Sequence, residues 1–197
     1  MTSHERIKED SETGSDIVGI CLDAKTGKKL WERIIPGTRK TDLSSLFSDN
    51  TAASPVSDGE RVVFMNVGGK IACFDFEGKE LWTHKWTPFG RHHARAHEPI
   101  LHDGMVIVTH TPKYDLPIEA STKAGSKGLG RGLEYWNFLR AYNLKTGKLT
   151  WQAEAGTSVH STSMLGQLAK GKLAILTGRG GGHEPPEEPY GLSMIDV

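Results

Sequence analysis

The chain has 197 residues, 37% of them hydrophobic, which suffices for one sizeable domain or for part of a larger one. The chain has 24 Lys and Arg residues and 24 Asp and Glu residues, so its net charge is zero. It therefore lacks the excess of basic residues that is typical of proteins that bind nucleic acids or membrane surfaces. No apolar run is long enough for a membrane span, so neither nucleic acid nor a membrane span is predicted; 23 glycines and 9 prolines predict many turns rather than long helices.

The N-terminal segment, residues 1–16, is polar and charged and has no apolar core of a signal peptide. Two short β-rich runs follow within residues 17–35, and the phrase "CLDAKTGKKLW" joins them. Gly27 suits the positive φ that a tight turn needs and that other residues resist. We interpret the two runs as the last strands, C and D, of a four-stranded antiparallel unit.

Residues 54–86 predict a complete unit with strands A to D. "SPVSDGERVVFMNV" indicates a short strand, a turn at Asp58-Gly59 and a strongly apolar strand. "CFDFEGKELW" then repeats the earlier phrase one residue shorter, with Gly78 ahead of Trp82. Runs such as "RVVFM" are short, β-branched and bounded by turn residues, which favours strands over helices.

Residues 97–154 predict a second complete unit with an insertion at 111–136. Its phrases are "EPILHDGMVIVTH" and "AYNLKTGKLTW", and a looser copy of the first phrase opens an incomplete unit at 162–197. Four-stranded sheets that recur without intervening helices are typical of β-propeller blades. Closed propellers use roughly four to eight blades. The sequence therefore predicts an all-β fold with about three blades' worth of sheets, an incomplete segment of a larger ring.

The two cysteines occupy the same position in successive copies of the repeat. Cys21 and Cys73 stand where the third copy has Ala141. Equivalent positions in adjacent repeats are separated by the repeat spacing, which exceeds the Cα distance of a disulfide. We therefore predict small buried side chains rather than a disulfide or a catalytic thiol.

The repeated phrase A-x-D-x-x-T-G-x-x-x-W resembles the tryptophan-docking motif of the quinoprotein alcohol dehydrogenase-like propellers, also called PQQ-like repeats. Its three copies contribute these matching residues: Asp23, Thr26, Gly27 and Trp31; Asp75, Gly78 and Trp82; Asn143, Thr146, Gly147 and Trp151. The resemblance covers most of residues 17–197 and implies that each indole packs against the turn of a neighbouring blade. Independently, a tryptophan buries a large apolar area and its N–H needs an acceptor.

Open strand edges at both ends of such an arc invite pairing with other strands. The resemblance implies that the rest of the propeller, or another protein, covers them.

All long connections fall in the B–C and D–A positions, which share one rim of a propeller blade. We expect the working surface there, because rigid scaffolds present functional loops, and we expect it to take a ligand that the sequence does not identify. The candidate ligand-binding residues at this rim are His93, His97, Glu98, His160 and Arg179. Solvated loop histidines, or histidines bonded to loop backbone, are the alternative interpretation. The sequence has no H-E-x-x-H spacing, so no metal site is predicted.

The resemblance also raises the question of the cofactor. In quinone-dependent relatives the quinone is clamped by a ring between adjacent cysteines, and calcium lies beside it. This chain has no Cys-Cys pair. No cofactor is predicted, and pyrroloquinoline quinone with calcium would enter only if other blades supplied the site.

Two functions remain open at this level. The first is a binding or scaffold propeller for a protein, peptide or carbohydrate. The second is a segment of a quinoprotein-type oxidoreductase whose site is completed elsewhere, and no catalytic residue is identified for it. The resemblance implies a periplasmic or exported location, since most relatives are found there.

Overall fold

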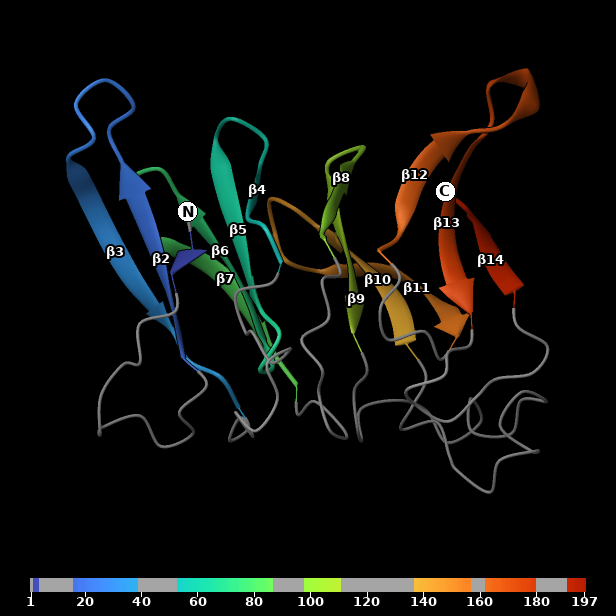
Figure 1. Ribbon diagram of the computed structural model, residues 1–197, viewed down its shortest axis with the longest axis horizontal. Helices are drawn as coiled ribbons and strands as arrows, with labels where there is room; N and C mark the ends of the chain where they lie inside the picture. The colour runs from blue at the N-terminus through green and yellow to red at the C-terminus, as the bar shows by residue number, and fades with distance from the viewer. Residues whose placement is uncertain are drawn as a thin grey trace.

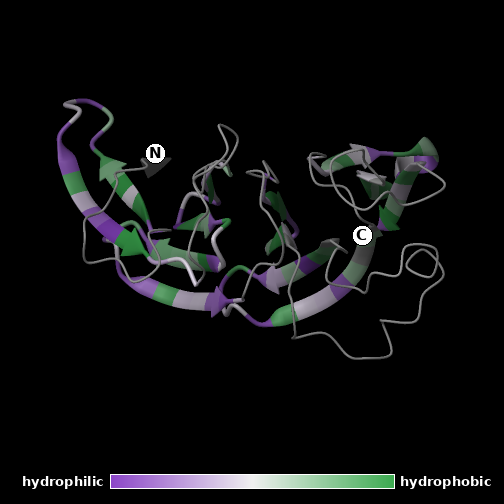
Figure 2. Cartoon of the chain, turned by 60° about the horizontal axis from the view of Figure 1, so that its bottom comes forward, coloured by the Kyte–Doolittle hydropathy of each residue, from purple (hydrophilic) through white to green (hydrophobic). Residues whose placement is uncertain are grey.

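A computed structural model describes residues 2–3, 16–38, 53–86, 98–110, 137–156, 162–179 and 191–197. These residues form four antiparallel sheets, which lie side by side in an open arc (Figure 1 and Figure 2). The all-β propeller-segment fold predicted from the repeats is confirmed.

The four sheets follow one another along the chain. The first contains β1 (Thr2–Ser3), β2 (Ile17–Leu22) and β3 (Lys29–Ile35). The second contains β4 (Val56–Ser57), β5 (Arg61–Asn66), β6 (Lys70–Asp75) and β7 (Glu80–Lys85). The third contains β8 (Ile100–His102), β9 (Met105–His110), β10 (Asn137–Asn143) and β11 (Leu149–Gly156). The fourth contains β12 (Met164–Gln167), the 3₁₀ turn η3 (Ala169–Gly171), β13 (Leu173–Arg179) and β14 (Gly191–Asp196).

Strand pairing follows the order A-B-C-D in the second and third sheets. The first sheet has its C and D strands as β2 and β3, and β1 adds a short strand beside β2 that the sequence did not predict. The fourth sheet has A, B and C as β12, β13 and β14. Within the described residues no helix is long and apolar enough to cross a membrane.

The C–D hairpins of the first three sheets share one register. Cys21, Cys73 and Ala141 each lie opposite the tryptophan of their own copy, and a register shift follows immediately in all three hairpins. A shift of this kind leaves one residue unpaired and increases the local twist. The repeated phrase thus codes for one hairpin geometry, in which the tryptophan always projects from the same face of its sheet.

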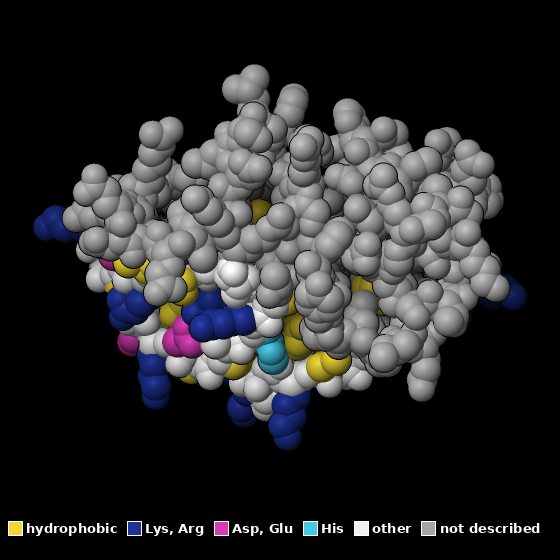
Figure 3. Space-filling model, turned by 90° about the horizontal axis from the view of Figure 1, so that it is seen from below, with side chains coloured by type: hydrophobic (Ala, Val, Ile, Leu, Met, Phe, Trp, Pro, Cys, Tyr) yellow, Lys and Arg dark blue, Asp and Glu magenta, His cyan; other side chains and the backbone are white. Residues whose placement is uncertain are grey.

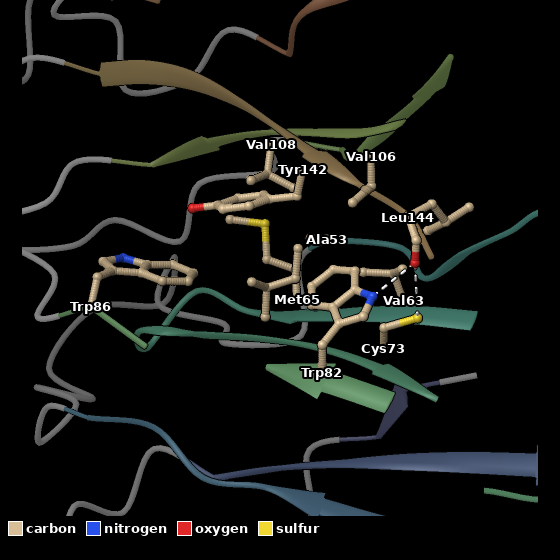
Figure 4. Close-up of a cluster of buried hydrophobic side chains, with 11 residues drawn as sticks. Ala53, Val63, Met65, Cys73, Trp82, Trp86, Val106, Val108, Tyr142 and Leu144 are labelled. Atoms are coloured by element: carbon tan, nitrogen blue, oxygen red, sulfur yellow. Dashed lines mark hydrogen bonds between the residues drawn. The ribbon is translucent and has the colours of Figure 1, made fainter. Parts of the chain in front are cut away.

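Apolar side chains are buried between neighbouring sheets. The cluster between the second and third sheets joins Val63, Cys73 and Trp82 to Val106 and Tyr142 (Figure 4). Similar clusters contain Phe64 and Phe74 on the side of the first sheet, and Leu139 and Ile175 on the side of the fourth. Each inner sheet is therefore apolar on both faces and depends on two neighbours for its burial.

The short hairpin turns and the remaining strand ends lie at opposite edges of the arc. In Figure 1 the turns that join β2 to β3, β4 to β5, β8 to β9 and β12 to β13 lie at the upper edge. The ends of β3, β7, β9 and β13 lie at the lower edge. Figure 3 views the molecule from this lower side, where the described part presents charged side chains of both signs between hydrophobic ones.

Candidate functional site

The lower edge is held by hydrogen bonds between neighbouring sheets. The Asn66 side chain, which is fully buried, donates from Nδ2 to the Ile35 carbonyl at 2.8 Å and accepts from the Gly68 amide at 2.7 Å. Thr38 donates from its amide to the Gly68 carbonyl at 2.9 Å, and its hydroxyl donates to the Trp86 carbonyl. The segment that leaves β3 is thereby fixed across the B–C turn of the second sheet.

Glu98 is the one predicted ligand-binding residue whose side chain is described. Its carboxylate accepts a hydrogen bond from the Ser54 amide at 2.7 Å and a longer one from the Ser54 hydroxyl at 3.4 Å. Both residues stand just before the first strand of their sheet, so the contact joins the starts of β4 and β8. The carboxylate thus holds two sheets together at this edge.

The other four candidate residues cannot be placed in a site. His93, His97 and His160 lie outside the described residues, and of Arg179 only the backbone is described, at the end of β13. In the part of the chain that the structure describes, no group of three or more His, Cys, Asp or Glu side chains is arranged to hold a metal ion. The ligand role of these residues stays a prediction.

Two of the repeated tryptophans contact the next sheet in the same way. The Trp31 Nε1–H donates to the Phe76 carbonyl at 2.8 Å, and the Trp82 Nε1–H donates to the Leu144 carbonyl at 2.8 Å (Figure 4). Phe76 and Leu144 each follow the Asp or Asn of the repeated turn. The same hydrogen bond therefore links the first sheet to the second and the second to the third.

The glycines of these turns lie directly on the indole rings. A Cβ placed on Gly78 would stand 2.9 Å from Trp31 Cγ, and one on Gly147 would stand 2.7 Å from Trp82 Cγ. Both glycines also have positive φ, 80° and 71°. The sequence had suggested glycine here for the turn alone, whereas close approach of the indole is a second reason for it.

A further interaction between sheets involves the residue two positions after the tryptophan. Arg33 Nε donates to the Gly78 carbonyl at 2.6 Å, and His84 Nε2 lies 2.6 Å from the Gly147 carbonyl. The His84 ring also stacks on Tyr142, with ring centroids 4.4 Å apart. Sequence reasoning missed this position, although a polar side chain with a ring or guanidinium recurs there in two copies; the third copy has Ala153.

Trp151 also packs toward the next sheet, the fourth. It is half-buried, as Trp31 is, and lies in the cluster that contains Ile175, Ile195 and Val197. Val197 follows Asp196 and so holds the position of Phe76 and Leu144. Trp151 thus packs in the same cluster as the residue that holds this position in the fourth sheet.

The two cysteines are both free thiols, as predicted. Cys73 is fully buried, and its burial raises the pKa of the thiol to about 12. At neutral pH this thiol is protonated and thus a poor nucleophile. Cys21 is only half-buried, so the prediction of a buried side chain is wrong for this residue; its sheet lies at the end of the described arc.

Comparison with known proteins gives both family and fold matches. The sequence model of the family described as outer membrane protein assembly factor BamB, a PQQ-like repeat family, matches residues 11–127. The tetrathionate hydrolase of Acidithiobacillus ferrooxidans is 30% identical over 172 residues, which cover 81% of this chain and 29% of that protein. The chain thus spans less than a third of the length of this curated relative.

Several solved structures resemble the arc at low sequence identity. A quinohemoprotein alcohol dehydrogenase from Pseudomonas putida HK5 matches with a TM-score of 0.50 and 12% identity, over 92% of this chain and 31% of that chain. BamB from Moraxella catarrhalis matches with a TM-score of 0.40 and 13% identity, over 93% of this chain and 46% of that chain. A europium-containing methanol dehydrogenase matches with a TM-score of 0.40 and 15% identity, over 72% and 21%. At these identities the first likeness supports the fold alone.

Proposed function

The chain belongs to the PQQ-like repeat family described as outer membrane protein assembly factor BamB, and from this premise we propose that it acts as a binding scaffold through the edge that carries its long connections. The supporting observation is the hydrogen-bonded base of that edge, where Asn66, Thr38 and Glu98 each join two sheets. The proposed ligand is a protein, a peptide or a carbohydrate.

A rigid base favours binding because fewer groups have to be ordered when a ligand arrives. Asn66 and Gly68 are buried, so their bonds are protected from water and fix the B–C turn of the second sheet. Connections anchored to such a base can vary in length and chemistry without disturbing the sheets. The repeated tryptophans serve the scaffold in this proposal, and ligand recognition belongs to the connections.

We propose that the quinone of the dehydrogenase relatives is not retained. Those relatives clamp the quinone with adjacent cysteines, whereas Cys21 and Cys73 lie in different sheets. Cys73 contacts the Leu144 carbonyl and is buried, and the indoles of Trp31 and Trp82 are packed against the next sheet. These contacts support the proposal that the described residues serve the scaffold and not a quinone site.

The alternative proposal is a segment of an enzyme whose site is completed outside these residues. It is favoured by the 30% identity to a tetrathionate hydrolase. A thiolate can attack a sulfur–sulfur bond, but the raised pKa of Cys73, about 12, excludes this thiol from that role near neutral pH. The enzyme proposal consequently depends on residues other than Cys73.

Photo-crosslinking in cells that make the full-length protein separates the two proposals. A photoreactive residue is placed at Pro36 or Val67 on the proposed binding edge, and at Glu60 or Asp103 on the opposite edge as matched controls. The scaffold proposal predicts discrete adducts from Pro36 and Val67 only. Adducts of equal yield from all four positions would contradict it.

Activity assays of the purified full-length protein form the second arm. The protein is incubated with pyrroloquinoline quinone and calcium, and dye-linked alcohol oxidation and tetrathionate hydrolysis are measured. The scaffold proposal predicts no turnover above the buffer rate in either assay. Turnover of either substrate would support the enzyme proposal. A periplasmic or exported location, which is typical of this family, is proposed as well, and fractionation of the same cells tests it.

A further inference from the structure

The interface between the third and fourth sheets changes from apolar to polar along the strands. Its apolar part includes a row of side chains that lie opposite one another across β12, β13 and β14 and pack toward the third sheet: Leu165, Ile175 and Ile195. Two residues nearer the lower edge, Thr177 lies opposite Ser193, and Ser163 continues the register of β12 opposite Thr177. Because alternate residues of a strand share a face, a row of hydroxyls follows the apolar row.

This row of hydroxyls faces the third sheet. Ser193 Oγ donates to the Ala155 carbonyl at 3.1 Å, and Ser163 Oγ and Thr109 Oγ1 lie 3.4 Å apart. Thr109, Ser163 and Thr177 are only 3%, 5% and 4% exposed. Four hydroxyls from the two sheets are thus gathered at one level, which we call the hydroxyl layer: Thr109, Ser163, Thr177 and Ser193.

The hydrogen bonds of the hydroxyl layer are incomplete among the described residues. The distance of 3.4 Å between the Ser163 and Thr109 oxygens is longer than an ordinary O–H···O bond, which measures about 2.5–3.0 Å. The Thr177 hydroxyl has no hydrogen-bond partner in the described part of the chain. A buried hydroxyl without a partner destabilises the folded state, so a further group is needed to bind it.

The first and second sheets meet at the same level through a direct bond. Asn66 and Thr177 hold equivalent places, in the second strand of their sheet and on the face toward the preceding sheet. Asn66 Nδ2 donates to the Ile35 carbonyl at 2.8 Å. The equivalent carbonyl of the third sheet, Ala155, accepts its bond from Ser193, and the side chain of Thr177 is one bond shorter than that of asparagine. The direct contact that Asn66 makes is therefore missing at Thr177.

We propose that the hydroxyl layer is a binding site for a neutral oxygen that both donates and accepts hydrogen bonds, the chemistry shared by water and a carbohydrate hydroxyl. The oxygen bridges Thr177 Oγ1 to Ser163 Oγ or Thr109 Oγ1. Hydroxyls suit such a ligand because each of them can also donate and accept. No charged side chain takes part in the described hydrogen bonds of the layer, which favours a neutral ligand over an ion.

The hydroxyl layer lies close to the proposed binding edge. Thr109 is the last residue but one of β9 (Met105–His110), and Thr177 lies two residues before the end of β13 (Leu173–Arg179). A ligand hydroxyl at that edge is therefore near enough to take the place of a water molecule. The inference concerns the interface between two sheets, so it holds whether or not the edge binds a macromolecule.

The first test removes one hydroxyl without changing the shape of the side chain. In Thr177→Val the bridging bond is lost, and the equilibrium constant for unfolding in a urea titration should rise about 5-fold or more, as for the loss of one hydrogen bond. Thr83→Val is the matched control, because Thr83 Oγ1 donates directly to the Ile71 carbonyl at 2.9 Å, and it should give a rise of similar size. An unfolding constant that is unchanged or lowered in Thr177→Val would overturn the inference, since a hydroxyl without a partner is replaced by an apolar group at no cost.

The second test identifies the source of the oxygen. In crystals of the protein grown without polyols, we expect an ordered oxygen atom about 3 Å from Thr177 Oγ1 and from Ser163 Oγ or Thr109 Oγ1. Soaking with glucose then separates the two sources: a water molecule that stays in place identifies water as the ligand, and a glucose hydroxyl in its place identifies a carbohydrate. A direct bond from Thr177 to Ser163, with no atom between them, would overturn the inference.

Discussion

Replacing Gly147 by alanine tests whether the indole contact stabilises the arc. Gly147 has a φ of 71°, and its Cβ would stand 2.7 Å from Trp82 Cγ and 2.8 Å from Trp82 Cδ2. Because the indole is held by its hydrogen bond to the Leu144 carbonyl and by burial against Tyr142, it cannot move aside without loss of these contacts. The substitution therefore combines backbone strain with overpacking.

The two contributions can be separated by a control with the same backbone strain. A left-handed conformation costs an alanine roughly 1–2 kcal/mol, and overpacking of a buried site costs roughly 1–3 kcal/mol. Gly104→Ala carries only the cost of backbone strain. Gly104 has a φ of 68°, but no atom of a described residue lies within 4 Å of a Cβ placed on it. The free energy of unfolding should therefore fall by about 2–5 kcal/mol for Gly147→Ala and by about 1–2 kcal/mol for Gly104→Ala.

Urea unfolding, monitored by circular dichroism, measures both free energies. Equal slopes of the transition in the two variants and the unchanged chain confirm that the same surface is exposed on unfolding. If Gly147→Ala is unfolded in buffer, it is measured in a stabilising osmolyte. The melting temperature there gives a lower bound on the loss in free energy of unfolding. Equal destabilisation by the two substitutions would refute the reasoning, because the indole would then add nothing to the cost at Gly147.

Three further predictions follow from single side chains. Burial raises the pKa of the Cys73 thiol to about 12, so this thiol should resist alkylation at neutral pH until the chain unfolds, whereas Cys21 should be alkylated first. Mass spectrometry of timed samples checks this order. Rapid labelling of Cys73 in the folded chain would contradict it. The pKa of Asp23 lies below its ordinary value of 3.8, chiefly because the Thr26 hydroxyl and then the Thr26 amide donate hydrogen bonds to its carboxylate. The ionised carboxylate therefore stabilises the turn above pH 3.8, and this contribution is lost as the pH falls through the pKa of the folded state. The NMR signal of the Thr26 amide should therefore shift as Asp23 is protonated, and Asp23→Asn should abolish this shift, since Asn143 accepts the same bonds without titrating. An acid transition that is unchanged in the variant would show that a group other than Asp23 causes it. Asn66→Ala leaves the Ile35 carbonyl without its buried donor and should lower the free energy of unfolding by about 1–3 kcal/mol, against about 0.5 kcal/mol or less for the exposed Lys79→Ala.

Much of the fold could be predicted because local sequence patterns mark the turns and strands of the repeat. Gly27, Gly78 and Gly147 ahead of their tryptophans mark three hairpins, and apolar runs such as "RVVFM" mark the strands between them. These signals depend on backbone conformation and on alternation within a few residues, which a sequence displays directly. The short strand β1 escaped prediction because two polar residues carry no such pattern.

The contacts between sheets could be predicted only in part. The role of Trp82 follows from its recurrence, but its acceptor, the Leu144 carbonyl, lies 62 residues away. Asn66 and the Ile35 carbonyl are 31 residues apart, and a single asparagine at a strand end gives no hint of that bond. Glu98 was predicted to bind a ligand, and its carboxylate contacts Ser54 of the preceding sheet. The histidines of the candidate site fall outside the described residues, so their role stays a prediction.

Hydrogen exchange at the indole nitrogens tests the central claim most directly. If each tryptophan joins its sheet to the next, the Nε1–H groups of Trp31 and Trp82, bonded to the Phe76 and Leu144 carbonyls, must be protected together. In ¹⁵N-labelled protein, with the signals assigned by single Trp→Phe variants, both indole protons should exchange far more slowly than those of the urea-unfolded chain. Exchange of either proton at the unfolded rate under native conditions would contradict the account.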